Sequence, residues 1–229
     1  MKVTLSFETT SSNDVSIMVD ALRASTTITL ALNNFKRIIP CCTPEEAFKL
    51  KDEFNGVIAG ERGGEMIEGF DIGNSPQELK SFKTDKDTLI LTTSNGTRIL
   101  ENMKSTVLVG CMVNAEAVGK ASIEIAKTHI DVVMAGVKGN FALEDFLASG
   151  EILYWICENL DDCEINDYAK AAILASRDYD SVKDGFRNSA SGKRLAKLNY
   201  EEDIEFCLLK NITNNVAIYK NSELTLIKD

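Results

Sequence analysis

Residues 17–27 read Ile-Met-Val-Asp-Ala-Leu-Arg-Ala-Ser-Thr-Thr, and this stretch decides the fold class. Its apolar beginning completes a predicted strand over Val15–Val19, and its hydroxyl-bearing end opens a predicted helix over Ser25–Asn33. A strand that passes directly into a helix is the repeating unit of α/β folds with a mainly parallel sheet. We therefore expect the same alternation on both sides of this stretch.

Short apolar runs alternate with helical patterns through the first 135 residues. Predicted strands cover Val3–Phe7, Val15–Val19, Arg37–Pro40, Val57–Ala59, Thr88–Thr92, Val107–Gly110 and Ile130–Ala135. Predicted helices cover Ser25–Asn33, Pro44–Phe54, Ser75–Phe82 and Ala115–Thr128. The second of these helices has a specific start signal, because Thr43 is an N-cap residue and Glu46 completes a capping box.

The final third of the chain has a different pattern. Helices are predicted over Leu143–Leu160, Asp167–Ser176, Ser189–Leu198 and Glu201–Leu209, followed by a hairpin of Val216–Tyr219 and Leu224–Lys228. The predicted fold is a three-layer α/β/α architecture with a mostly parallel or mixed sheet, a helix-rich C-terminal third and a closing β-hairpin. No linker separates the parts, so we predict one domain over residues 1–229; two lobes, about 1–135 and 136–229, are the alternative.

Charge and composition exclude several classes of protein. The formal net charge is −10 at pH 7, which disfavours nucleic acid because phosphate backbones are bound by clustered Lys and Arg. No apolar run approaches the ~20 residues of a membrane span, and residues 1–5 lack the features of a signal peptide. Six cysteines occur without CxxC spacing, which favours reduced thiols in a cytoplasmic protein. An anionic ligand would require a local positive pocket.

Three predicted strand-to-helix junctions carry polar residues that the fold alone does not require. At the first, Asp20 follows a strand and could bind a metal, whereas Arg23 and helix amides could hold an oxyanion. The alternative is that Asp20 or Ser25 only caps the helix. The sequence leaves these two interpretations open.

The second junction runs from Gly60 to Pro76 and contains five glycines, which is typical of a backbone that turns sharply or approaches a ligand. Glu61 and Asp71 are candidate ligands for Mg²⁺, which prefers carboxylate and water oxygens. An ordinary charged surface loop is the alternative.

The third junction, residues 89–98, reads Leu-Ile-Leu-Thr-Thr-Ser-Asn-Gly-Thr-Arg. Successive N–H groups, hydroxyls and a guanidinium can together cradle a phosphate, although the P-loop spacing is absent. Asn95-Gly96 could instead form only a tight turn.

A fourth junction places Cys111 and Asn114 after a strand. Cys111 is a candidate nucleophile if a helix start lowers its pKa, and a small packing residue otherwise. Other phosphatase signatures fit poorly: His129 is the one histidine, and the DxDxV pattern of Asp178–Val182 follows a predicted helix rather than a strand.

Together these segments resemble the 2-phosphosulfolactate phosphatase family. The blocks that carry the resemblance are residues 20–28, 60–62, 69–76, 92–98, 114–118, 136–150, 191–192 and 203–207. The match covers nearly the whole chain, and residues 160–188 and the last fifteen residues match less clearly.

The resemblance implies a Mg²⁺-dependent phosphatase that converts 2-phospho-3-sulfolactate to 3-sulfolactate, a step that leads to coenzyme M in methanogens. From the needs of that reaction we predict Mg²⁺ ligation by Asp20, Glu61 and Asp71, and catalytic roles for Asp20, Arg23, Arg98 and Cys111. The sequence leaves open whether the nucleophile is a metal-activated water, Asp20 or Cys111. The substrate-binding residues would be Ser25, Arg62, Asn74, Ser75, Thr93, Ser94, Asn95, Gly96, Thr97 and Asn114. The rival hypothesis is a non-catalytic module that binds a phosphometabolite. A homodimer is a hypothesis without a specific sequence signal.

Overall fold

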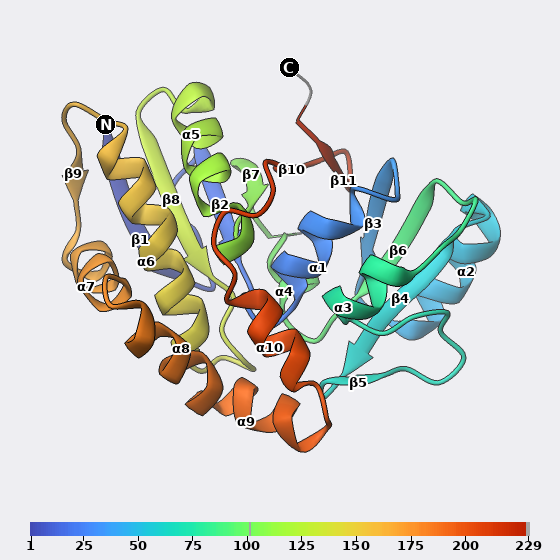
Figure 1. The fold of residues 1–229 in the computed structure, drawn as a ribbon. Coiled ribbons are helices and arrows are strands. Elements are labelled where there is room, and N and C mark those ends of the chain that lie inside the picture. Colours follow the sequence, from blue (N-terminus) through green and yellow to red (C-terminus); the bar gives the residue numbers. More distant parts are fainter. Residues whose placement is uncertain (101, 228–229) are drawn as a thin grey trace.

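The alternation of strands and helices is present in the computed structural model, which describes residues 1–100 and 102–227 apart from the side chains of Thr97 and Arg98 (Figure 1). The strands are β1 Lys2–Phe7, β2 Val15–Val19, β3 Arg37–Cys41, β4 Val57–Arg62, β5 Glu65–Met66, β6 Thr88–Thr92, β7 Thr106–Val109, β8 His129–Met134, β9 Glu164–Ile165, β10 Ala217–Lys220 and β11 Glu223–Leu226. The α-helices are α1 Ala24–Ala31, α2 Pro44–Phe54, α3 Pro76–Ser81, α4 Gly96–Leu100, α5 Ala115–Ile125, α6 Leu143–Glu158, α7 Asp167–Ser176, α8 Tyr179–Asn188, α9 Ala190–Lys197 and α10 Glu201–Cys207, and a 3₁₀ helix η1 covers Met112–Asn114.

The strands form one mixed sheet of eleven strands in the order β5-β4-β6-β3-β11-β10-β7-β2-β8-β1-β9. Pairing is parallel within the β4-β6-β3 half and within the β7-β2-β8-β1-β9 half. The C-terminal hairpin β10–β11 is antiparallel to β7 on one side and to β3 on the other. The predicted closing hairpin therefore lies in the middle of the sheet and joins its two halves.

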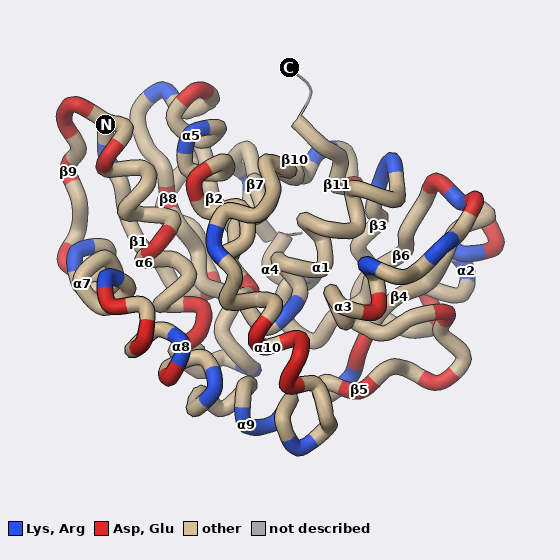
Figure 2. Tube along the Cα trace, viewed as in Figure 1, with Lys and Arg blue, Asp and Glu red and all other residues tan. Residues whose placement is uncertain are grey.

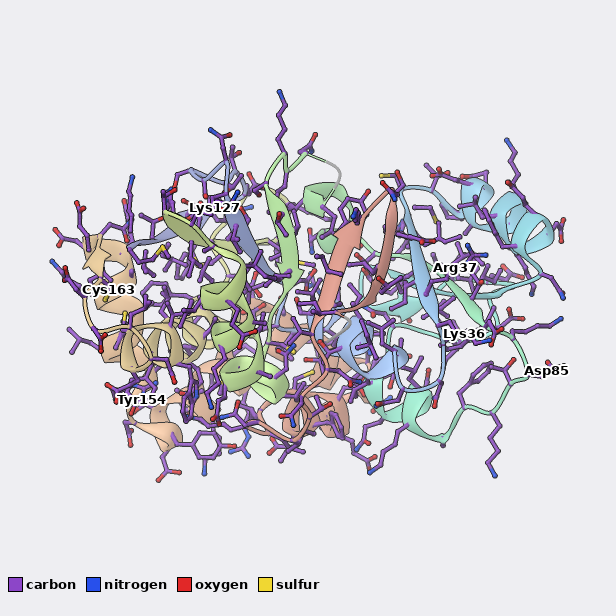
Figure 3. The ribbon with its side chains drawn as sticks, turned by 90° about the horizontal axis from the view of Figure 1, so that it is seen from above. Lys36, Arg37, Asp85, Lys127, Tyr154 and Cys163 are labelled. Carbon is purple, nitrogen blue, oxygen red and sulfur yellow. The ribbon has the colours of Figure 1, made fainter. Side chains whose placement is uncertain are left out.

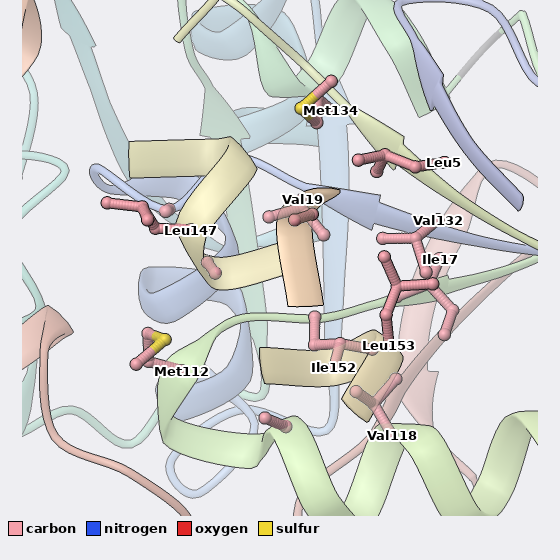
Figure 4. Close-up of a cluster of buried hydrophobic side chains, with 14 of the residues drawn as sticks. Leu5, Ile17, Val19, Met112, Val118, Val132, Met134, Leu147, Ile152 and Leu153 are labelled. Carbon is pink, nitrogen blue, oxygen red and sulfur yellow. The ribbon is translucent and has the colours of Figure 1, made fainter. Parts of the chain in front are cut away.

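Side chains on β2 alternate between two hydrophobic cores, as the two-residue period of a strand requires. Ile17 and Val19 pack with Val118 of α5 and Ile152 of α6 (Figure 4). Met18 belongs to the second core, which includes residues of α1, β3, β6 and β11. Burial on both faces explains why four of the five residues of β2 are apolar without alternation, and the three-layer prediction is confirmed.

The helices of the C-terminal third connect the two halves of the sheet. Consecutive contacts link α6 to α8, α8 to α9, α9 to α10 and α10 to α3, and Figure 1 shows this path along the lower side of the molecule. Seen from above, Lys36, Arg37 and Asp85 lie on the side of the β4-β6-β3 half, and Lys127, Tyr154 and Cys163 lie on the other side (Figure 3). No helix in the described part of the chain combines the length and the apolar composition that a membrane span requires.

Helix α8 was not among the predicted elements. Of its ten residues only Val182 and Phe186 are buried, so its apolar signal is weak in the sequence. Asp178 is its N-cap and accepts a hydrogen bond from the Ser181 N–H at 3.0 Å. The DxDxV pattern therefore begins a helix that follows another helix, which is not the strand end that haloacid-dehalogenase-type chemistry requires.

Candidate active site

A pocket lies where the loops after β2, β4, β6 and β8 meet helix α9. It has a volume of about 460 Å³ including its open mouth, and it is lined by Asp20, Leu22, Arg23, Glu61, Gly63, Gly64, Asn74, Ser94, Asn95, Val137, Lys138, Arg194 and Leu195. Two carboxylates, two arginines and a lysine thus face one small space. The structure brings together Asp20, Arg23, Glu61, Asn74, Ser94 and Asn95 of the predicted site residues.

Asp20 is held where β2 passes into α1. Its N–H donates to Ser25 Oγ at 2.8 Å, and its Oδ1 accepts from the Ala24 N–H at 3.4 Å. Burial, and then the charges of Glu61 and Glu144, raise the pKa of Asp20 to about 7. Ser25 is fully buried, accepts the hydrogen bond from the Asp20 N–H and does not line the pocket.

Glu61 is the second-last residue of β4 and is fixed by two backbone donors. Its Oε1 accepts from the Ser94 N–H and its Oε2 from the Gly64 N–H, both at 2.7 Å. The Gly96 N–H donates to Asp20, and a Cβ at Gly96 would lie 3.1 Å from Asp20 Oδ2. Glycine therefore lets the backbone close onto this carboxylate.

These contacts change the role of the predicted phosphate cradle. The N–H groups of Ser94 and Gly96 donate to carboxylates of the protein, so they are not open to an anion. The side chains of Ser94 and Asn95 line the pocket, and Asn95 Oδ1 accepts from the Lys138 N–H at 3.2 Å. Thr93 is buried and does not line the pocket. The predictions for the Thr97 and Arg98 side chains fall outside the described residues.

Arg23 is buried with its charge already compensated. Its Nη1 donates to Asp203 Oδ2 at 2.6 Å, its Nη2 donates to the Gly64 carbonyl at 2.7 Å, and its guanidinium lies over the Tyr200 ring. Ser75 Oγ donates to the other oxygen of Asp203 at 2.7 Å. Ser75 therefore supports this ion pair and caps α3, and it does not line the pocket.

Sequence reasoning missed Lys138 and Arg194, which line the pocket, and Glu144 and Asp145, which lie behind Asp20. Asp145 accepts from the Ala21 N–H at 2.8 Å and from the Gly136 N–H at 2.9 Å, so it ties the loops after β2 and β8 together. Its pKa is raised by burial and then by the Asp20 charge. A signal was present, because residues 143–147 belong to a block of the family resemblance, but sequence alone does not show which strands are neighbours.

Asp71 is not part of this site, which corrects the predicted three-carboxylate metal centre. Its oxygens accept from Lys51 Nζ at 2.7 and 2.8 Å, and Oδ2 also accepts from the Ile58 N–H at 2.9 Å. Ile58 lies near the beginning of β4, whereas Glu61 lies near its end. Asp71 therefore stabilises the loop that returns along β4.

Arg62 is also outside the pocket. Successive side chains of a strand point to opposite faces, so Arg62 points away when Glu61 points in. Its guanidinium donates to the Glu61 and Cys42 carbonyls and to Thr92 Oγ1. This arginine connects the ends of neighbouring strands and is not among the residues that line the pocket.

Cys111 and Asn114 are packing residues in the structure. Cys111 is fully buried with Val113 and Phe206, and burial raises the pKa of its thiol. Asn114 Oδ1 accepts from the Cys111 N–H at 3.0 Å, and its amide donates to the Val109 carbonyl. Neither residue lines the pocket, so the predicted roles of Cys111 as a nucleophile and of Asn114 as a substrate ligand do not fit.

The pocket fits a magnesium ion better than a metal caged by the protein. Asp20 and Glu61 offer carboxylate oxygens, and Asn74 Oδ1 is a buried acceptor without a partner. Among the described residues, no group of three or more His, Cys, Asp or Glu side chains is arranged to hold a metal. Mg²⁺ is commonly bound by one or two carboxylates together with water and substrate phosphate, so two carboxylates and an amide oxygen are sufficient.

Fold and site define an α/β protein with a small polar pocket that combines carboxylates with cationic side chains. The family model for 2-phosphosulpholactate phosphatase matches residues 3–222. The 2-phosphosulfolactate phosphatase of Methanothermobacter thermautotrophicus is 46% identical over 229 residues, covering 100% of this chain and 97% of that protein. Probable 2-phosphosulfolactate phosphatases of Caldanaerobacter subterraneus and Clostridium acetobutylicum are 37% and 35% identical, each over 93% of this chain and over 90% and 92% of their own lengths. The chain belongs to the 2-phosphosulfolactate phosphatase family.

Proposed function

We propose that this protein is a phosphoric monoester hydrolase that converts 2-phospho-3-sulfolactate to 3-sulfolactate and phosphate. The observation that carries the proposal is the pairing of Asp20 and Glu61 with Arg23, Arg194 and Lys138 around one pocket. In the overall reaction a P–O bond forms to the oxygen of water and the ester P–O bond breaks. The departing oxygen on carbon 2 takes a proton and becomes the hydroxyl of 3-sulfolactate.

Asp20, Glu61 and Asn74 would hold Mg²⁺. When bound, this ion would neutralise phosphoryl oxygens and stabilise the charge that develops during transfer. Glu61 is suited to this role because two backbone N–H groups fix its orientation. Fixed ligands are ordered before substrate arrives, so less reorganisation is needed during the reaction.

The cations and the loop after β6 would orient the substrate. Arg23 is immobilised by Asp203 and Tyr200, and immobilisation lets a guanidinium direct its remaining donors without loss of side-chain entropy. Ser94 and Asn95 line the pocket together with the carboxylates. These groups would hold the phosphate against Asp20 and Glu61.

A non-catalytic anion-binding module is the rival function. Such a module gains nothing from carboxylates beside its anion, because like charges repel. Asp20 and Glu61 are buried at the pocket wall, at 7% and 8% exposure, and this arrangement is costly unless a cation or a proton is also bound there.

Phosphate release from 2-phospho-3-sulfolactate tests the proposal directly. We expect release in the presence of Mg²⁺, loss of release with EDTA, and recovery when Mg²⁺ is restored in excess. Absence of release with Mg²⁺ would favour the non-catalytic module. Release that EDTA does not affect would retain the hydrolase and remove the metal from the proposal.

We further propose that the enzyme acts in the cytoplasm as a homodimer and supplies 3-sulfolactate for coenzyme M synthesis in organisms that make this cofactor. Its six cysteines are free, which fits a reducing compartment. Light scattering of the purified protein measures the number of subunits, and a monomer at micromolar concentration would contradict the dimer.

A further inference from the structure

The cations of the pocket differ in how much of their charge is available to a ligand. Arg23 is engaged by Asp203, and both partners have side chains only 2% exposed. Among the described residues, Arg194 and Lys138 line the pocket without a carboxylate in ion-pair contact. The uncompensated positive charge of the described pocket therefore comes from these two side chains.

Arg194 is the more deeply placed of the two. It lies on α9, where Figure 2 shows basic positions beside the acidic α10. Its Nε is buried without a hydrogen-bond partner, and its Nη2 makes only a long contact of 3.4 Å to Ser191 Oγ. Lys138 is exposed at the mouth of the pocket. A buried N–H without a partner is costly. The Arg194 guanidinium lines the pocket and has no short hydrogen bond to the protein, so it keeps donor capacity for a ligand.

The position of Arg194 follows from a glycine turn, in which Gly63 has a φ of +67° and Gly64 a φ of +100°. A Cβ on Gly64 would lie 4.0 Å from Arg194 Nε and 3.0 Å from Leu198 Cδ1. This turn brings α9 close to the loop that holds Glu61 through the Gly64 N–H. Arg194 thus faces the same pocket as the carboxylates although it comes from a distant part of the chain.

We propose that Arg194 is a specificity-determining residue that binds the sulfonate of the substrate. This inference rests on the proposed function, because the phosphate is assigned to Asp20, Glu61 and their metal. The sulfonate is attached to carbon 3, one bond farther from the phosphate than the carboxylate is, so it reaches a different wall of the pocket. A guanidinium presents several donors in a plane and suits a sulfonate, whose three oxygens share one charge. Leu195 and Leu22 provide apolar surface for the adjacent methylene.

The test compares two substrates that differ only in the sulfonate: 2-phospho-3-sulfolactate and 2-phospholactate. In Arg194→Met we expect kcat/KM for 2-phospho-3-sulfolactate to fall about 10- to 100-fold, mainly through KM, because a charge-assisted hydrogen bond is lost. The fold-decrease in kcat/KM for 2-phospholactate should be at least ten times smaller than the fold-decrease for 2-phospho-3-sulfolactate. Arg194→Lys keeps the charge and should recover part of the preference for the sulfonate.

The matched control is Lys193→Met, which removes the same charge from the neighbouring, exposed position of α9. This variant should leave the ratio of the two kcat/KM values unchanged. Calorimetric titration gives a readout independent of turnover: Arg194→Met should weaken 3-sulfolactate binding and leave the weak binding of lactate little changed. If circular dichroism shows that Arg194→Met is unfolded, the same calorimetric titration is carried out on Arg194→Lys.

The outcomes separate the two proposals. If Arg194→Met leaves the ratio of the two kcat/KM values unchanged, the proposed role of Arg194 is wrong, while the proposed phosphatase activity stands. A wild-type protein that hydrolyses neither substrate with Mg²⁺ would overturn both. A selective loss for the sulfonated substrate with an unaffected Lys193→Met supports both.

Discussion

The pocket has two walls of different origin. One wall comes from the loops after β2, β4 and β6, and it presents Asp20 and Glu61 with their oxygens held by backbone N–H groups. The other wall comes from the C-terminal helices, which supply Arg194 to the pocket and Asp203 to Arg23. The carboxylates that line the pocket thus come from the loops at the strand ends, whereas the C-terminal helices supply one arginine of the pocket and the counter-charge of another.

This difference shows why a run of N–H groups does not by itself predict an anion site. The loop of Ser94 to Gly96 has the composition of a phosphate cradle, but two of its N–H groups already bind carboxylates of the protein. The same donors that attract phosphate attract Asp and Glu. Selectivity for an external anion then depends on side chains that retain uncompensated charge.

The largest expected effect separates two of the three predicted metal ligands, Asp20 and Asp71. Asp20→Asn should lower kcat by about 10³-fold, because loss of a metal ligand removes several kcal/mol of charge stabilisation. Asp71→Asn is the matched control, since Asp71 contacts Lys51 and Ile58 away from the pocket. Its kcat should stay close to the wild-type value in a phosphate-release assay. The reverse pattern would return Asp71 to the site.

The next effect contrasts a buried ion pair with an exposed one. Asp203→Asn leaves the Arg23 guanidinium buried without its counter-charge, and the free energy of unfolding should fall by about 3–5 kcal/mol. Glu205→Gln removes a carboxylate of the same helix whose pairing with Arg187 is half exposed, so urea unfolding should change little. Similar losses in the two variants would show that the Arg23–Asp203 pair does not hold the C-terminal helices to the first wall.

The third effect is the pH dependence of stability in metal-free protein. The pKa of Asp20 is about 7 in the folded state against 3.8 ordinarily, so between these values the folded state keeps a proton that the unfolded state loses. The free energy of unfolding should therefore decrease as pH rises from about 4 to about 7, by at most roughly 4 kcal/mol.

Asp20→Asn lacks this titration, so its stability should depend less steeply on pH in the same window. Urea unfolding in EDTA at several pH values between 4.5 and 8 measures the two slopes. Equal slopes for the wild type and the variant would mean that Asp20 is not the group that titrates.

Local sequence signals were sufficient for most of the elements. The predicted strands over Val15–Val19 and Thr88–Thr92 and the helix over Pro44–Phe54 have the same limits in the structure. Thr43 accepts from the Glu46 N–H, which is one half of the predicted capping box, whereas the Glu46 carboxylate accepts from the Cys42 N–H. Strand and helix patterns, turns and caps depend on residues close together in the chain, so they can be read from it. Helix α8 was missed because few of its side chains are buried.

The site residues could be predicted from the sequence only in part. Asp20 and Glu61 follow strands and could be found from their position at the strand ends. Whether each acid also faces the pocket depends on its interaction partners in the folded chain. Asp71 pairs with Lys51 instead. Arg194 and Asp203 lie more than 100 residues beyond these acids. Asp203 belongs to a block of the family resemblance but has no strand end or loop pattern that marks a site, and Arg194 belongs to no such block. Only the path of the C-terminal helices brings them to it.

The sequence by itself therefore determined the α/β class, a mostly parallel or mixed sheet and the family, because these follow from local periodicity and from motifs in order along the chain. Tertiary structure alone decided which acids share the pocket, which N–H groups remain open and which arginine keeps its charge. The physical reason is that electrostatic and hydrogen-bonding partners are chosen by distance in space, and distant segments meet only after the two halves of the sheet have been joined.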